Sequence, residues 1–412
     1  MKTTIIGGGA SGMAAAVFAS KRGDEVTVLE HNDRIGKKIL QTGNGRCNLT
    51  NSTLEGPVHG NFSSLSPSGI RFCDDVIKRF GYKETLRFFK SLGLEFRQRG
   101  DLVYPKSDQA SSVLDALRFA LEELKVSVKT GIEVRSVKKE KDKGFIIKTD
   151  DGTFSCDRLI IAAGSKAAPQ TGSDGSGYAI AESFGHRIER PMPALVPLKC
   201  KGDFFKSVSG VRCPVKLSLS DGDKVIYNES GELQYTQYGI SGIVTMNISN
   251  RLHLCKKNAF VFIDHMENDS KDELCSMLME RRERFRNRSV KDLMTGVINK
   301  KLFEMLLKES GIDMNREVFL ISDEEIKTLA SHIKEFKIKI EGTMGFDHSQ
   351  ICMGGIDPVE LDENMQSRIV PSLYFCGEII DAHGDCGGYN LQLCWSTGAI
   401  AGSCGELEDI FL

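Results

Sequence analysis

The sequence predicts an α/β protein with a Rossmann-like domain formed by two separate pieces of the chain, and three observations carry this prediction. Residues 3–30 read as a strand, a glycine-rich turn, a helix and a second strand. Beyond Pro191 the chain changes to short alternating runs, and after residue 270 it becomes helical and charged. Near the C-terminus a buried strand, Tyr374–Cys376, and a helix of small residues, Asn390–Cys404, repeat the strand-and-helix pattern of the first segment.

The opening unit carries a dinucleotide-binding fingerprint in its full context. Its parts are the strand Thr4–Ile6, the glycines Gly7, Gly9 and Gly12, the helix Met13–Lys21 and the strand Glu25–Leu29. Gly7 permits a tight turn, Gly9 lets the backbone approach a pyrophosphate, and Gly12 lets helix and strand pack closely. Glu30 ends the second strand and is placed to accept hydrogen bonds from ribose hydroxyls. An ordinary βαβ unit without a ligand is the alternative.

The remaining elements of the first piece follow from periodicity and turn residues. A polar, glycine-rich loop spans residues 36–51. The expected elements after it are helical sequence over Val76–Leu92, a helix over Ala110–Leu124, strands at Val126–Thr130 and Glu133–Lys138, a hairpin of Gly144–Thr149 and Thr153–Cys156, and a buried strand at Leu159–Ala163. This order predicts residues 1–190 as the first piece of the dinucleotide-binding domain.

The middle of the chain reads as an insertion. Alternating runs separated by Asp-Gly and Ser-Gly turns predict a β-rich module over residues 191–269. Charged helical sequence predicts a helical part over residues 270–335, and 336–355 supplies one or more return strands of the β-rich module. Residues 356–412 then close the first domain.

Composition excludes several classes of protein. The net charge of −2 argues against a protein that coats nucleic acid, so no nucleic-acid partner is expected. No apolar run reaches the roughly 18–20 residues of a membrane span. The 12 cysteines form no C-x-x-C pair, which disfavours a zinc ribbon or a thioredoxin-type motif and indicates reduced thiols in a cytoplasmic protein.

Four blocks of sequence carry a resemblance to a known family. They are GKKILQTGNGRCNLTN from Gly36, the segment Leu159–Leu198, GISGIVTMNIS from Gly239 and GEIIDAHGDCGGYNLQLCWSTGAIAG from Gly377. These blocks resemble the YhiN/BaiN-like family of bacterial FAD-dependent oxidoreductases, which includes aminoacetone oxidase-type flavoproteins and a bile-acid pathway reductase. The resemblance implies a two-piece FAD-binding domain, an inserted β-barrel-like domain and a small helical domain.

The fingerprint and the resemblance together give a set of expected FAD contacts. By resemblance, Arg34, Lys37 and Lys38 lie near the pyrophosphate or the ribityl chain, with solvated surface cations as the alternative. Asp381 occupies the position that accepts a ribityl hydroxyl, and Gly388 belongs to the turn whose amides point at the flavin O2. The full set is Gly7, Gly9, Ala10, Ser11, Gly12, Glu30, His31, Arg34, Lys37, Lys38, Gly45, Arg46, Cys47, Asn48, Val134, Ala163, Gly164, Gly377, Glu378, Asp381, Gly388, Tyr389, Asn390 and Leu391.

Three of the polar residues are candidates for the chemistry itself. Arg46 and Asn48 follow two glycines, and a cation beside N1 and O2 stabilises reduced flavin. His383 is a candidate proton donor, with a structural histidine as the alternative. Cys47 lacks a partner cysteine, so a small packed residue is favoured over a redox thiol. His383 and Cys386 alone make too few ligands for a metal, and no metal is expected.

These features favour an FAD-dependent oxidoreductase that transfers hydride through flavin N5. Enone-like reduction with NADH or NADPH and amine oxidation with oxygen both remain open. No second glycine fingerprint follows a later strand, so a nicotinamide donor would bind only transiently. The alternatives are an RNA-modifying flavoprotein and a flavin-bound redox sensor without turnover.

Overall fold

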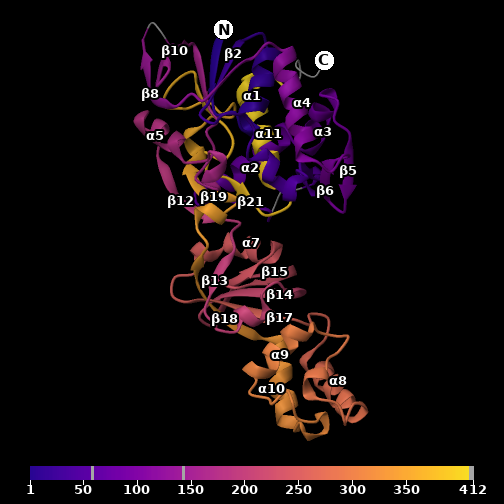
Figure 1. The fold of residues 1–412 in the computed structure, drawn as a ribbon. Helices are drawn as coiled ribbons and strands as arrows, with labels where there is room; N and C mark the ends of the chain where they lie inside the picture. Colours follow the sequence, from indigo (N-terminus) through magenta and orange to yellow (C-terminus); the bar gives the residue numbers. More distant parts are fainter. Residues whose placement is uncertain (57–59, 142–143, 408–412) are drawn as a thin grey trace. The chain divides into compact units, whose positions relative to one another are not determined.

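The computed structural model describes residues 1–56, 60–141 and 144–407 (Figure 1). The chain divides into two compact units. The first comprises Met1–Ala194 and Phe346–Leu412, and the second comprises Leu195–Gly345. Each unit has its own cluster of buried apolar side chains. The predicted α/β class is confirmed.

A five-stranded parallel sheet forms the centre of the first unit, in the order β20-β11-β1-β2-β7. Its strands are β1 (Lys2–Ile6), β2 (Glu25–Glu30), β7 (Ser127–Thr130), β11 (Arg158–Ile161) and β20 (Leu373–Phe375). The central strands β1 and β11 are almost wholly buried, as expected of parallel strands covered on both faces. Both the first strand of the chain and one of its last therefore belong to one sheet.

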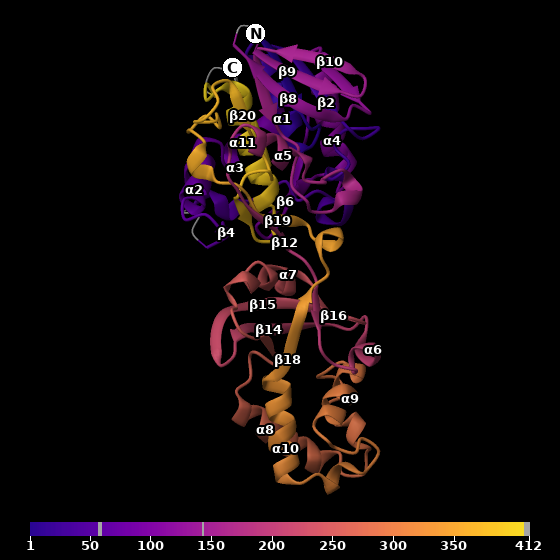
Figure 2. The same ribbon diagram turned by 90° about the vertical axis from the view of Figure 1, so that its left-hand side faces the viewer.

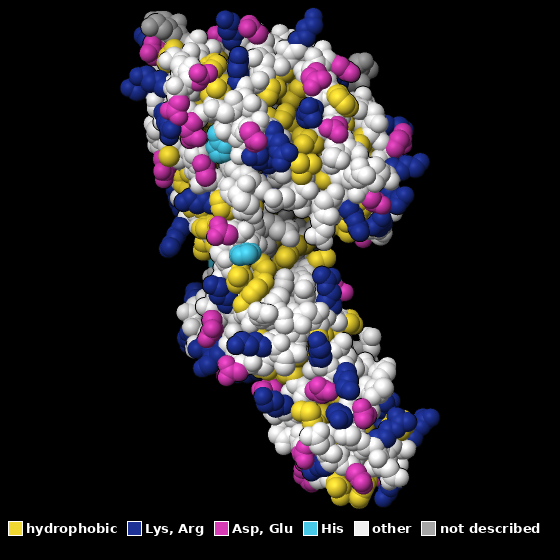
Figure 3. Space-filling view, in the orientation of Figure 1, with side chains coloured by type: hydrophobic (Ala, Val, Ile, Leu, Met, Phe, Trp, Pro, Cys, Tyr) yellow, Lys and Arg dark blue, Asp and Glu magenta, His cyan; other side chains and the backbone are white. Residues whose placement is uncertain are grey.

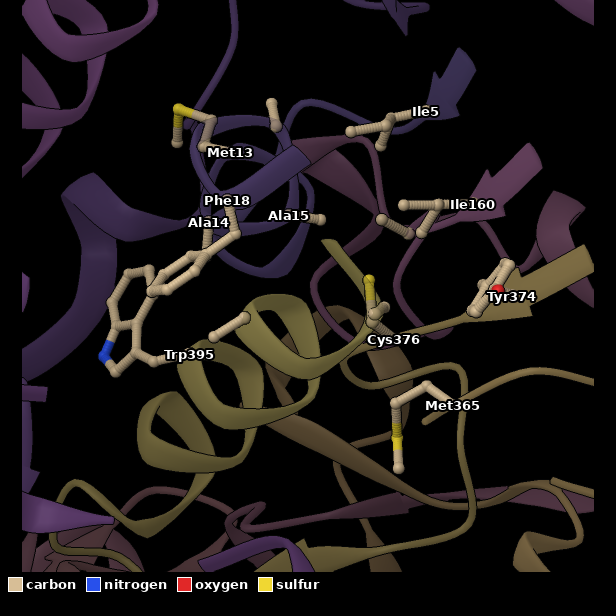
Figure 4. Close-up of a cluster of buried hydrophobic side chains, with 14 of the residues drawn as sticks. Ile5, Met13, Ala14, Ala15, Phe18, Ile160, Met365, Tyr374, Cys376 and Trp395 are labelled. Carbon is tan, nitrogen blue, oxygen red and sulfur yellow. The ribbon is translucent and has the colours of Figure 1, made fainter. Parts of the chain in front are cut away.

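Two helices from opposite ends of the chain pack side by side next to this sheet, as Figures 1 and 2 both show. They are α1 (Ala10–Lys21) and α11 (Tyr389–Ser403). A Cβ atom on Gly398 or Gly402 would lie 2.4 Å from the carbonyl oxygen of Ser11 or Ala15, respectively, so only glycine permits this approach. Figure 4 shows Phe18 of α1 and Trp395 of α11 in the core between them.

Further elements surround the parallel sheet. They are α2 (Gly69–Arg79), α3 (Tyr82–Ser91), α4 (Ala110–Glu123), α5 (Ser176–Ser183) and an antiparallel sheet of β8 (Val134–Glu140), β9 (Gly144–Thr149) and β10 (Gly152–Cys156). The expected hairpin of β9 and β10 is confirmed. The helical sequence over Val76–Leu92 is two helices rather than one, because Gly81 is extended and caps α3.

The second unit is built on a closed barrel in the order β13-β16-β15-β14-β17-β18. Its strands are β13 (Leu198–Cys200), β14 (Arg212–Asp221), β15 (Lys224–Thr236), β16 (Gly239–Ser241), β17 (Ala259–Asp264) and β18 (Phe336–Thr343). The helices of this unit are α6 (Phe205–Val208), α7 (Ile243–Ser249), α8 (Lys271–Arg284), α9 (Lys300–Glu309) and α10 (Asp323–Lys334). Serine caps with a reciprocal glutamate open both α8 and α10.

The limits of the insertion differ from those expected from the sequence. Residues 191–194 and 346–355 lie in the first unit, because β12 (Ile188–Ala194) pairs antiparallel with β19 (Ile351–Ile356) there. The expected return segment 336–355 is thus divided between the two units. Within the three described ranges, no helix combines the length and apolarity needed to cross a membrane.

Candidate functional site

The turn between β1 and α1 contains three glycines that are required for different reasons. Gly7 has φ +105°, and a Cβ atom there would lie 2.4 Å from the carbonyl oxygen of Ala162. A Cβ on Gly12 would lie 1.9 Å from the carbonyl oxygen of Gly7. A Cβ on Gly9 would meet no heavy atom within 4 Å. No side chain caps α1 at Gly9, so its first amides suit an anionic group.

Glu30 ends β2 beside this turn, with 8 % of its surface exposed. Its Oε2 accepts a hydrogen bond from the amide of Gly8 at 2.8 Å, and its Oε1 accepts from the amide of Asn32 at 2.9 Å. The ring of His31 lies within 4.0 Å of three carboxylates, those of Glu30, Glu133 and Asp174. Oε1 also accepts from Nδ2 of Asn32 at 2.7 Å, so by its two lone pairs Oε2 is the oxygen that retains capacity for a ribose hydroxyl.

A lysine, a glutamate and a serine meet where β11 and β20 end. The Nζ atom of Lys38 lies 2.6 Å from Oε2 of Glu378, and Oγ of Ser165 donates to the same oxygen at 3.0 Å. Glu378 follows β20 directly after Gly377, and Ser165 follows β11 after Gly164. The sequence interpretation missed Ser165. The sequence feature that could have identified Ser165 is a small polar residue just after a buried strand, at the edge where α/β sheets bind ligands.

The other two expected cations do not join this group. The ammonium of Lys37 lies 2.7 Å from Oδ1 of Asp33 and 3.0 Å from Oδ1 of Asn32. The hydrogen bond that Lys37 donates to Asp33 lowers the pKa of the Asp33 carboxyl. The exposed side chain of Arg34 makes no hydrogen bond or ion pair with any described residue. Of the three expected cations, only Lys38 is held at the strand ends.

Asp381 is fully buried and has a structural role. Its carboxylate accepts hydrogen bonds from Oγ of Ser64 at 2.8 Å and from the amides of Leu65, Ser66 and Gly354 at 3.3, 2.7 and 2.9 Å. These four donors occupy both oxygens. The carboxylate thus joins the loop before α2 to β19 and is not presented to a ligand. The family resemblance implied a ribityl hydroxyl as the partner of Asp381.

The glycine-rich loop after Ile39 turns sharply before β3 (Thr50–Asn51). Asn44 adopts a left-handed conformation with φ +54°, which asparagine tolerates better than most residues. The side chain of Arg46 is exposed and makes no hydrogen bond or ion pair with the described residues. Asn48 is buried, and its Oδ1 accepts a hydrogen bond from the amide of Val103 at 3.1 Å. Arg46 is therefore the available cation of this loop.

Cys47 lies beside Arg46 but is completely buried. Burial raises the pKa of its thiol to about 12, against a small opposing effect of Thr42. A thiolate is needed for nucleophilic or redox exchange, and this thiol stays protonated near neutral pH. The geometry agrees with a small packed residue.

Left-handed glycines lead into α11. Gly388 has φ +93°, and a Cβ there would lie 2.8 Å from the carbonyl oxygen of Thr50. Asn390 accepts a hydrogen bond from the amide of Gly384 at 2.8 Å and donates to its carbonyl oxygen at 2.9 Å. The hydroxyl of Tyr389 lies 3.0 Å from Oγ1 of Thr53. The start of α11 is thus fixed by contacts with the glycine-rich loop and β21 (His383–Gly384).

His383 is only 2 % exposed, in a two-residue strand that pairs with β4 (Phe62–Ser63). Within the described ranges, no three His, Cys, Asp or Glu side chains are grouped to hold a metal ion. A small cavity of about 10 Å³ adjoins Gly377 and Glu378, with room for about one water molecule. Its lining also includes Asn390 and Thr397 of α11.

The remaining expected residues occupy the same edge of the sheet or its surroundings. Ala163 and Gly164 follow β11, and Gly377 follows β20. A Cβ on Gly377 would lie 2.3 Å from Oγ of Ser11, so the two ends of the chain meet closely here. The other expected residues are Ala10 at the start of α1, Gly45 in the glycine-rich loop, Val134 at the start of β8 and Leu391 in α11.

Comparisons with known proteins agree with this architecture. A family model described as the HI0933-like protein Rossmann domain matches residues 1–404. The chain is 41 % identical over 407 residues to a 3-dehydro-bile acid delta(4,6)-reductase of Clostridium scindens, covering 97 % of each. It is 30 % identical over 400 residues to a ribosomal RNA dihydrouridine synthase of Escherichia coli, covering 95 % of each. A 3-ketosteroid delta1-dehydrogenase structure from Sterolibacterium denitrificans, 13 % identical, covers 98 % of both chains with a TM-score of 0.50, which indicates a shared fold only.

Proposed function

This chain belongs to the HI0933-like family, and from that premise we propose that it is an FAD-dependent oxidoreductase that reduces a carbon–carbon double bond conjugated with a carbonyl. That it is an enzyme follows from its reductase relative, which matches along 97 % of both chains. The observation that carries the proposal is the open space at Gly9, in front of an uncapped helix and beside Glu30.

The residues at the strand ends fit the parts of FAD in order. The amides after Gly9 would hold the pyrophosphate, since the positive end of α1 points into open space. Glu30 would accept hydrogen bonds from the adenosine ribose. The hydrogen bonds of Asp381 are already taken by protein donors, so we propose Glu378 in its place as the acceptor for the ribityl hydroxyls. Lys38 and Ser165 hold the Glu378 carboxylate in position. When bound, FAD supplies a ring that takes up and gives up hydride at N5.

The chain's own polar groups would act on the charge that develops during hydride transfer. Hydride adds to the double-bond carbon farther from the carbonyl group, which places negative charge on the carbonyl oxygen. A proton must then reach the double-bond carbon next to the carbonyl group. Arg46, exposed and without an ionic partner among the described residues, is suited to stabilise such charge. We assign Asn48 a supporting role in that loop, and His383 remains the candidate proton donor.

The names of the two relatives support this reaction class. Both names describe hydrogen addition across a carbon–carbon double bond, in a bile acid in one case and in uridine in the other. A small enone-like acceptor is the first proposal because the 41 % identical relative acts on one. Uridine in RNA is the second, because the 30 % identical relative matches along 95 % of the chain. Amine oxidation with oxygen is a third, less supported reading.

Turnover assays test these proposals, without oxygen for the two reductions and with oxygen for the amine oxidation. The purified protein is expected to be yellow, and denaturation should release FAD rather than FMN. NADH or NADPH oxidation should depend on an added 3-oxo-4-ene steroid, or on uridine-containing RNA if the second proposal holds. Oxygen consumption with a primary amine would instead favour the oxidase. A colourless protein that FAD cannot reconstitute would refute the flavin assignment itself.

A further inference from the structure

The outer face of the barrel carries a group of residues that the flavin chemistry does not use. Strand β17 alternates: Val261 and Ile263 point into the core and are fully buried, whereas Phe260 and Phe262 are partly exposed. Large aromatic side chains at alternate positions on the outside of a strand are not needed to fill the barrel. Both rings lie on the outer side of the strand, where another molecule can contact them.

Lysines surround these two rings. The ammonium of Lys337, on β18, lies 4.3 Å from the ring centroid of Phe260 and 5.3 Å from that of Phe262. Lys339 is the cross-strand partner of Phe260. On the other side, Lys216 of β14 is exposed beside β17. We call these five residues the basic–aromatic face.

The acidic residues nearby do not cancel this charge. Asp264 is the cross-strand partner of Lys216, but its carboxylate is paired with Lys334 at 2.7 Å. Glu341 is exposed on the same strand as Lys337 and Lys339. The exposed Lys199 lies opposite Gly342, next to Glu341, on the neighbouring strand β13. Lysine therefore outnumbers free carboxylate along β14, β17, β18 and β13. On the visible face of the second unit, Figure 3 shows Lys and Arg side chains interspersed with Asp and Glu.

The same face of β14 continues into a groove. Arg212 and Lys216 both point outward on β14, while Val215 and Leu217 between and beyond them are buried. Arg212 lines an open groove of about 730 Å³ together with Lys300 and Lys301 at the start of α9. Its one acidic lining residue is Glu304, and Arg212 also lies 3.2 Å from Glu232. The groove thus extends the positive charge beyond the aromatic rings.

We propose that the basic–aromatic face binds single-stranded nucleic acid, with bases stacked on Phe260 and Phe262 and phosphates held by the lysines. Aromatic platforms flanked by cations suit this ligand because every base has a stacking face and every linkage has a charge. The ammonium of Lys337 occupies the ring faces in the free protein and turns to a phosphate when a base replaces it. The inference adds a binding face to the second proposed function, uridine in RNA, but its test does not rest on that function, because binding is measured without turnover.

Fluorescence anisotropy of a labelled oligonucleotide of about 12 residues tests the proposal, with oligo-U RNA and oligo-T DNA as separate arms. Binding should be clear near 50 mM salt and should weaken steeply by about 200 mM. Phe260→Leu/Phe262→Leu keeps apolar cover but removes the stacking faces, and should weaken binding roughly tenfold or more. Lys337→Glu/Lys339→Glu should weaken it at least as much.

A matched control distinguishes binding at this face from a nonspecific effect of changing the protein's net charge. Lys308→Glu/Lys327→Glu makes the same charge change on exposed lysines of α9 and α10, and should bind as the wild type does. All variants should keep the wild-type melting temperature and FAD content. Binding in either arm that the face variants lose and the control keeps would support the proposal. No binding in both arms, or equal losses in face and control variants, would overturn it and leave the flavin proposal untouched.

Discussion

At residue 9 the missing side chain leaves open space, whereas at residues 7 and 12 it leaves room for neighbouring backbone of the protein itself. A Cβ on Gly12 would meet a carbonyl oxygen at 1.9 Å, but one on Gly9 would meet nothing within 4 Å. The spacing of the motif predicts the close backbone approaches at Gly7 and Gly12, because each follows from local geometry; the contact of Gly9 with a pyrophosphate stays a prediction. The role of Asp381 could not be predicted, since its donors Ser64–Ser66 lie more than 300 residues away in the sequence.

Gly9→Val should abolish FAD binding without unfolding the protein. The branched side chain would occupy the open space before α1 and block its amides. The absorbance ratio at flavin and protein wavelengths after gel filtration measures the loss, and the melting temperature should match that of the wild-type apoprotein. Gly12→Val serves as the contrast and should reduce stability through its backbone clash. Full FAD occupancy in Gly9→Val would place the cofactor elsewhere.

Arg46→Ala should slow flavin reduction or reoxidation while FAD stays bound. Arg46 is exposed in the structure, but bound FAD and substrate would cover it, and loss of one charged donor at a covered site slows a reaction by about a hundredfold. Stopped-flow measurement of each half-reaction separates this effect from binding. Arg118→Ala, which removes an exposed arginine from α4, is the matched control. If both half-reactions keep their wild-type rates in Arg46→Ala, this loop has no part in the chemistry.

Helices and strands were predicted where one face or a whole strand is buried, but periodicity does not show where a single residue divides a helical segment. The apolar spacing over Val76–Leu92 continues across Gly81, so periodicity predicts helical sequence there without showing the break. The structure has two, because the extended backbone of Gly81 and the side chain of Glu84 form a new helix start. The pairing of β12 with β19 was invisible for another reason: about 160 residues separate the paired positions.

The barrel contains a buried histidine that should make its stability depend on pH. His265 accepts a hydrogen bond from the hydroxyl of Tyr235 at 2.8 Å and donates to the carbonyl oxygen of Ile333 in α10. Burial lowers the pKa of His265 from 6.5 to about 4. Between these values the unfolded chain is protonated and the folded chain is not, so stability present above pH ~6.5 is lost as the pH falls toward ~4.

The free energy of unfolding of the second unit should therefore fall by ~2–3 kcal/mol between pH ~7 and ~4.5, from this histidine alone. Urea unfolding at the two pH values measures the change. Tyr235→Phe/His265→Phe removes the titrating ring together with the hydroxyl that depends on it, and should show a smaller loss over the same interval. An equal loss in the double variant would mean that other groups control the acid sensitivity.

At the scale of the whole molecule, the composition of the chain indicated two kinds of structure, but the boundary between them depends on pairing. The first unit ends at Ala194 and resumes at Phe346, and all expected FAD contacts lie within it. The two units also have separate apolar cores, so neither core needs side chains from the other. The predicted insertion begins at residue 191, a few residues too early, and the first domain resumes at residue 356, about ten residues too late. The alternation of apolar and polar residues predicts a strand but cannot show which sheet the strand joins.

The first unit should therefore fold and bind FAD without the second. Replacing residues 195–345 with a short Gly-Ser linker is feasible, because Ala194 is the cross-strand partner of Ile351 and the amide of Ala168 donates to the carbonyl oxygen of Phe346. The shortened chain should melt cooperatively and retain one FAD per chain, as measured by calorimetry and by flavin release on denaturation. A shortened chain that folds but remains colourless would locate an essential cofactor contact in the second unit. One that fails to fold would show that the two cores are not independent.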